Sequence, residues 1–160
     1  MLFLNFNVTG SLLDAARQCE EDVFLKAFGN TREQLDAEYS QYDDQSVFLT
    51  VSDSDDNVLG ACRIITPGPA GFKSLNDVKG APWHIDGERS ARAAGADLSA
   101  TWDVATLGVR DSARGSKVQV AFYDRHYGNC ETTGCNDITL ATISNPRSSS
   151  GRRITYKRIT

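Results

Sequence analysis

The chain has 160 residues, 40% of them apolar and 24% charged, which predicts one globular domain with a sizeable core. Its net charge is −4, unlike the strongly basic domains that bind nucleic acid. No apolar run approaches the roughly 20 residues that a membrane-spanning helix needs. We therefore expect neither nucleic acid nor a membrane as a partner.

The first part of the chain predicts a strand followed by two helices. Residues 1–8 are apolar and short enough for a strand. Gly29 marks the end of the first helix. Thr31 and Gln34 form a capping-box pattern at the start of the second. The first helix is indicated by an apolar face with steps of three and four residues, formed by Leu13, Ala16, Cys19, Val23 and Ala27.

The next part predicts a hairpin and a long connection. Residues 46–52 and 58–66 are rich in β-branched and other apolar side chains, which favours two strands joined by a polar turn. Residues 72–99 are mixed in composition, with a short helix possible at 91–96. A connection of this length is usually functional or mobile.

Residues 101–109 predict a further strand, 118–127 a helix and 138–143 a last strand. The composition then changes to a basic, Ser-rich tail at 144–160. We therefore expect one domain over residues 1–143 and a tail after it. The fold class is α/β, with a mixed, mostly antiparallel sheet flanked by helices.

The segment from Leu107 to Val118 carries the clearest chemical pattern. A strand ends there and a helix begins, and the first amides of a helix lack internal partners and carry partial positive charge. Arg114 and Lys117 add positive charge. The pattern indicates a phosphate-binding loop, although an ordinary strand-to-helix turn with a basic surface has the same features.

This segment resembles the pyrophosphate loop of the GCN5-related N-acetyltransferase (GNAT) fold, and the predicted order of elements is similar to that of the fold. Arg114-Gly115 matches the Arg-Gly start of the loop. Lys117 and Gln119 stand where the family has two further glycines. The resemblance implies that the loop holds the pyrophosphate of an acyl-coenzyme A.

Upstream segments resemble one branch of that fold, the acyl-homoserine-lactone (autoinducer) and N-acyl amino acid synthases. They are Gln41-Tyr42-Asp43, Gly60-Ala61-Cys62-Arg63 and Trp102-Asp103. Asp43 and Arg63 match the polar active-site set of the branch. Asp103 stands where the branch has a Glu, and Thr106 where it has an Arg.

The resemblance implies an acyltransferase that moves an acyl group from a thioester to a small amine or amino-acid derivative. The donor would be acyl-CoA or an acyl-carrier protein, used as a cosubstrate with no permanently bound cofactor. Asp103 would be the base, assisted by Arg63 and Asp43. A non-catalytic binding or regulatory module is the alternative. The residues implied in donor binding are Leu107, Val109, Arg114, Gly115, Ser116 and Lys117.

Other interpretations of these residues stay open. Arg63 could simply pair with Asp43 or Asp103, and such a buried set is weak evidence for function. Asp103 could be a solvated strand residue. His126, Cys130 and Cys135 have no standard zinc spacing, so we expect no metal.

The buried positions expected for Cys19 and Cys62 indicate a reduced, cytoplasmic protein. A GNAT domain continues after its fifth strand with another helix and two strands, whereas residues 144–160 have no helical face. We therefore expect the C-terminal part of the domain to be shortened relative to that pattern. An open sheet edge invites pairing with another chain, so we expect a possible homo-oligomer.

Overall fold

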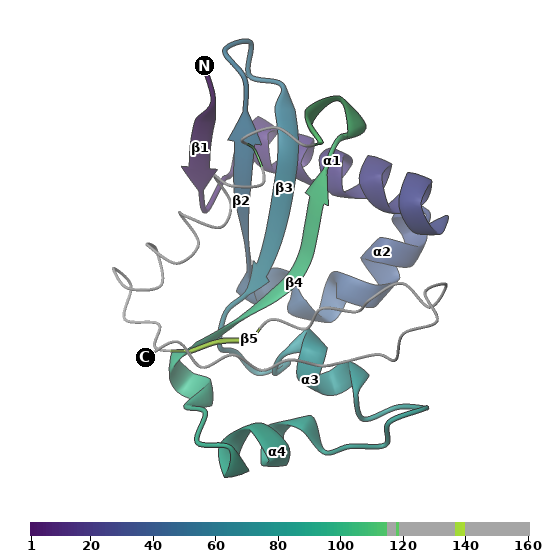
Figure 1. Cartoon of the computed structure of the whole chain (residues 1–160), viewed down its shortest axis with the longest axis vertical. Helices are drawn as coiled ribbons and strands as arrows, with labels where there is room; N and C mark the ends of the chain where they lie inside the picture. The colour runs from purple at the N-terminus through teal and green to yellow at the C-terminus, as the bar shows by residue number, and fades with distance from the viewer. Residues whose placement is uncertain (115–117, 119–136, 140–160) are drawn as a thin grey trace.

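The structure is a computed structural model, which describes residues 1–114, 118 and 137–139. Its centre is a five-stranded sheet in the order β1-β2-β3-β4-β5 (Figure 1). The first four strands are antiparallel to their neighbours, and β5 runs parallel to β4. The strands are β1 (Phe3–Phe6), β2 (Ser46–Ser52), β3 (Val58–Ile65), β4 (Thr101–Val109) and β5 (Asp137–Thr139).

Two helices, α1 (Gly10–Phe28) and α2 (Arg32–Tyr39), lie beside β3 and β4 (Figure 1). The end of α1 is set by Gly29, which has a φ of 78° and donates its N–H to the Leu25 carbonyl. A glycine adopts this left-handed conformation at little cost. The capping box of Thr31 and Gln34 opens α2 as predicted. A short 3-10 helix, η1 (Ser40–Gln45), leads into β2.

The connection from β3 to β4 is more ordered than the sequence indicated. It contains α3 (Lys73–Asp77), α4 (Gly87–Ala93) and a 3-10 turn, η2 (Leu98–Ala100). These elements gather at the end of the sheet where β4 begins (Figure 1). The helix expected at 91–96 begins earlier, because the Asp86 carboxylate caps its first turn by accepting from the Arg89 N–H.

The two faces of the sheet differ in chemistry. One face is apolar and includes Leu49, Cys62 and Ile64, all buried. The other face, against α1, contains Phe48 and Ala61 but also buried polar residues. Among the described residues, Arg63 and Glu20 place buried charge on this second face.

The predicted fold class is therefore confirmed for the part of the chain that the structure describes. Most of the predicted helix 118–127, residues 140–143 of the last strand and the tail 144–160 lie outside it. Within the described part, no helix has the length and apolar character to cross a membrane.

Candidate functional site

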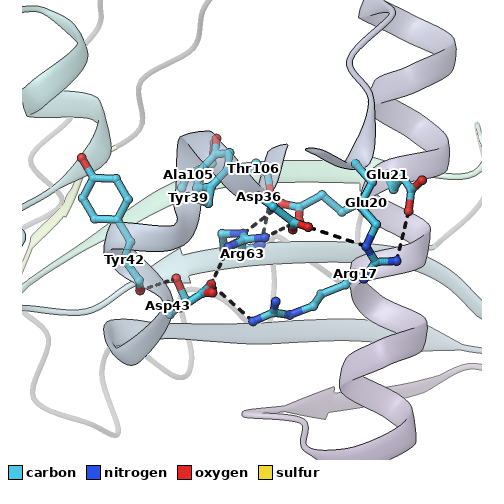
Figure 2. A network of polar contacts seen from close by, with 12 residues as sticks. Arg17, Glu20, Glu21, Asp36, Tyr39, Tyr42, Asp43, Arg63, Ala105 and Thr106 are labelled. Atoms are coloured by element: carbon cyan, nitrogen blue, oxygen red, sulfur yellow. Dashed lines mark hydrogen bonds and ion pairs between the residues drawn. The ribbon is translucent and has the colours of Figure 1, made fainter. Parts of the chain in front are cut away.

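A buried ion pair joins α1 to the centre of the sheet (Figure 2). Arg63, on β3, donates from Nη2 to Glu20 Oε2 at 2.7 Å and from Nε to Glu20 Oε1 at 3.1 Å. Arg63 is 3% exposed and Glu20 2%. A two-point contact between a guanidinium and a carboxylate fixes orientation as well as distance. The pair therefore forms a rigid centre for this face.

Aromatic rings enclose the guanidinium. The Arg63 Cζ atom lies 4.4 Å from the centre of the Tyr39 ring and 4.8 Å from that of Phe48. A cation above an aromatic face is stabilised by the ring quadrupole, more so without water. Burial raises the pKa of the Tyr39 hydroxyl, which keeps Tyr39 neutral.

Asp43 extends this network towards solvent. Its Oδ1 atom lies 3.4 Å from Arg63 Nη1 and 3.3 Å from Arg17 Nη2. The Asp43 side chain is 42% exposed. The predicted association of Asp43 with Arg63 is thus present, and Asp43 is its solvent-facing carboxylate.

The alternative interpretation of Asp103 as a solvated strand residue is wrong. Asp103 is fully buried, and its two oxygens accept from the Ser74 N–H at 2.9 Å and the Ser74 hydroxyl at 2.6 Å. Ser74 lies in the first turn of α3, so Asp103 caps that helix from a distant strand. Burial raises the pKa of the Asp103 carboxyl, and the two Ser74 hydrogen bonds offset only part of the rise. Among the described contacts, Asp103 shares none with Arg63 or Asp43.

β4 changes its partners along its length. It pairs with β5 only from Thr101 to Asp103. Its pairing with β3 shifts by one residue between Arg63↔Thr106 and Ile64↔Val104, which leaves Ala105 as a bulge. Beyond the bulge, as far as Val109, no described strand lies on the side of β4 opposite β3. Leu107 in this stretch is 39% exposed.

The loop after β4 begins in a cluster of ion pairs. Arg110 donates from Nε to the Val58 carbonyl at 2.9 Å and also pairs with Asp22. Arg114 Nε lies 3.0 Å from Asp111 Oδ1, and the Arg114 side chain is 53% exposed. A hydrogen bond from Lys26 lowers the pKa of the Asp111 carboxyl. Both arginines therefore have acidic partners.

Several predicted loop and ligand residues fall outside the described part of the chain. They are Gly115, Ser116, Lys117, His126, Cys130 and Cys135. In the described part, no group of His, Cys, Asp or Glu is arranged to hold a metal ion.

The sequence analysis missed Glu20, although its position carries a signal. Glu20 stands four residues after Ala16 and three before Val23, inside the apolar stripe of α1. A charged residue in such a stripe is expected to be buried and paired.

Known structures resemble this chain in fold, whereas no protein-family model and no curated protein matches it. A GCN5-related N-acetyltransferase from Kribbella flavida is 16% identical, with a TM-score of 0.54, over 88% of this chain and 71% of that one. A GNAT family acetyltransferase from Brucella melitensis, in complex with acetyl-CoA, is 12% identical, with a TM-score of 0.53, over 88% and 76%. A ribosomal-protein-alanine N-acetyltransferase from Brucella melitensis biovar Abortus 2308 is 15% identical, with a TM-score of 0.53, over 93% and 83%.

The sheet with its helices therefore defines an α/β protein built around a bulged antiparallel sheet. More specifically, the fold is that of the GCN5-related N-acetyltransferases. Identities this low establish the fold alone.

Proposed function

We propose that this protein is an N-acyltransferase that moves an acyl group from acyl-CoA or an acyl-carrier protein to a small amine or amino-acid derivative. The observation that carries the proposal is the edge of β4 between the bulge at Ala105 and Val109. It lies beyond the pairing with the described residues of β5 and leads directly into the Arg114 loop. An extended donor can pair with backbone groups along a strand edge of this kind.

The proposal assigns the donor to β4 and the loop that follows. Backbone groups of Leu107 and Val109 would pair with the pantetheine arm. Arg114, with Gly115, Ser116 and Lys117, would contact the pyrophosphate. The acetyl-CoA complex of the Brucella melitensis relative in fold supports a coenzyme A thioester as the donor.

The reaction requires a base and stabilisation of an oxyanion. The amine nitrogen attacks the thioester carbonyl, the C–N bond forms, the C–S bond breaks, and the products are an amide and a free thiol. A proton leaves the amine nitrogen, either to a carboxylate or through water. Asp103 is the predicted base. Its complete burial means that direct contact with an acceptor requires α3 to move, whereas Asp43 already faces solvent.

The non-catalytic module is the second candidate, and one observation favours it. Asp103, Arg63 and Arg114 all have protein partners: Ser74, Glu20 and Asp111 respectively. A site in which each charge is already satisfied is what a purely structural network looks like.

We further propose that the chain belongs to the acyl-homoserine-lactone and N-acyl amino acid synthase branch, on the likeness of Gln41-Tyr42-Asp43, Gly60-Ala61-Cys62-Arg63 and Trp102-Asp103. We also propose a cytoplasmic location and a homo-oligomer. Light scattering at micromolar concentration tests the homo-oligomer, and a monomer there contradicts it.

Binding of thioesters is the test that separates the two functions. Thermal shift and calorimetry are measured with coenzyme A, acetyl-CoA and a long-chain acyl-CoA, and amide formation is measured with a set of small amines. A ligand at a hundredfold excess over its Kd stabilises by about 2.7 kcal/mol, which corresponds to a rise in Tm of roughly 5–10 °C at this size.

The variant that tests the location of the site is Arg114→Ala, which should weaken coenzyme A binding. It should not lower the Tm of the free protein, because the Arg114 side chain is half exposed. Binding with turnover supports the enzyme. Binding without turnover, also with a carrier-protein donor, supports the module. No binding and no turnover with either donor refutes the acyl-thioester site.

A further inference from the structure

The bulge at Ala105 divides β4 into two parts with different surroundings. Before it, Thr101 to Asp103 pair with β5, and Asp103 and Val104 pair with β3. After it, from Thr106 to Val109, β3 is the only described neighbouring strand. A bulge bends its strand and re-aims the residues that follow. The direction of residues 106–109 therefore depends on what holds the chain just after the bulge.

The Thr106 hydroxyl makes two bonds at that point. It accepts from the backbone N–H of Arg63 at 3.3 Å and donates to Glu20 Oε1. Thr106 is 4% exposed. One hydroxyl thus links three elements, namely β4, β3 and α1, at the first paired residue after the bulge.

The other ends of these bonds are fixed. Arg63 donates to both carboxylate oxygens of Glu20, and its guanidinium packs on the rings of Tyr39 and Phe48. The Tyr39 hydroxyl also donates a long hydrogen bond, 3.5 Å, to the carbonyl of the bulged residue Ala105. A hydroxyl–carboxylate hydrogen bond to a rigid partner holds position better than one to a mobile side chain.

We propose that Thr106 is a positioning residue, which with Glu20 and Arg63 locks β4 in register after the bulge so that the edge at 107–109 is aimed at the acyl donor. The inference rests on the proposed function. Thr106 itself touches neither donor nor acceptor in this proposal. A strand segment misplaced by about 1 Å at a reacting centre lowers the rate by about a hundredfold.

A purely structural hydroxyl is the competing explanation, and two matched threonines on this face distinguish it. The Thr50 hydroxyl, on β2, is fully buried with no hydrogen-bond partner among the described residues. The Thr101 hydroxyl, on β4 before the bulge, donates to the Asp97 carbonyl at 2.7 Å. Thr50→Val controls for removing a buried hydroxyl, and Thr101→Val for removing a bonded one from the same strand.

The test compares Thr106→Val, Thr106→Ser and the two controls. Hydrogen exchange is measured on the β4 peptide covering 104–109, and kcat and KM are measured with the acyl thioester that binds best. We expect Thr106→Val to raise exchange in that peptide at least tenfold and to lower kcat by roughly a hundredfold with little change in the acceptor KM. Thr106→Ser keeps the hydroxyl and should restore both. Thr50→Val should have the hydrogen exchange and kcat of the wild type. Thr101→Val should have a lower Tm but an unchanged kcat.

Each outcome decides the matter. Local exchange and loss of kcat confined to Thr106→Val, with rescue by Thr106→Ser, support the positioning role. Equal losses in Thr106→Val and Thr101→Val, or failure of Thr106→Ser to rescue, overturn it while leaving the acyltransferase intact. If the wild-type protein turns over no thioester, the proposed function is refuted, and so is the role of Thr106 in positioning β4 for catalysis.

Discussion

Replacement of Asp103 separates its role as a helix cap from its predicted role as a base. Asp103→Ala removes the two carboxylate oxygens that accept hydrogen bonds from Ser74. It also leaves a cavity at a fully buried position. A buried donor without a partner costs about 1–3 kcal/mol, and the lost side-chain volume brings the total to about 2–4 kcal/mol. At about 2–4 °C per kcal/mol for a chain of this size, Tm should fall by roughly 5–15 °C.

Asp103→Asn should behave differently because it keeps the shape. The amide oxygen can accept from the Ser74 N–H while the amide nitrogen donates to the Ser74 hydroxyl, which can also accept. The change in stability should therefore stay within about 1 kcal/mol. A base, however, needs the carboxylate. Loss of about a hundredfold or more in kcat with an unchanged Tm would identify Asp103 as the base.

The pH dependence adds a check with a definite sign. Burial holds the pKa of folded Asp103 above its ordinary value. The stability that its protonated form contributes is fully present below the unfolded pKa of about 3.9 and is lost as the pH rises through the folded pKa. Denaturant unfolding should therefore show wild type losing stability relative to Asp103→Asn as the pH rises above about 4. A Tm for Asp103→Ala within 1 °C of wild type would refute the cap, whereas the opposite pH trend would show that the Ser74 hydrogen bonds outweigh the effect of burial on the Asp103 pKa.

Three further predictions concern the buried groups. Glu20→Gln should cost about 3–5 kcal/mol in denaturant unfolding because it removes the only buried carboxylate beside Arg63 among the described residues and leaves the half-exposed Asp43 as its anionic partner. Asp36→Asn at the exposed Arg32 pair should cost less than about 1 kcal/mol. Gly87→Ala should destabilise by about 1–3 kcal/mol, because its Cβ would meet the Leu75 carbonyl oxygen at 2.5 Å; Gly80→Ala, whose nearest atom is at 3.8 Å, should be close to neutral. Burial raises the pKa of Cys62 to about 12 and that of Cys19 to about 11, so neither thiol should react with a disulfide reagent at pH 8 until the protein unfolds; fast labelling of the native protein at either thiol, mapped by mass spectrometry, would contradict this.

The elements predicted well are those with local signals. The end of α1 follows from Gly29 and the start of α2 from Thr31 and Gln34, each of which acts within one helical turn. The hairpin of β2 and β3 follows from composition and a polar turn. In contrast, α3 has five residues and receives its cap from Asp103, 29 positions later. No pattern within residues 72–99 could reveal that partner.

The candidate site was predicted in part for the same reason. Arg63 and Asp43 were expected together and do form an ion pair. The expectation that Asp103 joins them is not met by any described contact, because the bulge and the α3 cap place it with Ser74. Glu20 carried a readable signal within the apolar stripe of α1 that the sequence analysis did not use.

The chemistry of the two sheet faces bears on why the Glu20–Arg63–Thr106 network is present. Among the described residues, Leu49, Cys62 and Ile64 belong to an apolar cluster on the other face of the sheet. Replacing a buried ion pair by well-packed apolar residues is often neutral or stabilising by about 1–4 kcal/mol. Stability therefore gives little reason for charges beneath α1. An apolar side chain at position 106 could fill the same space but could not fix a register next to a bulge, whereas a hydroxyl held by an anchored carboxylate can.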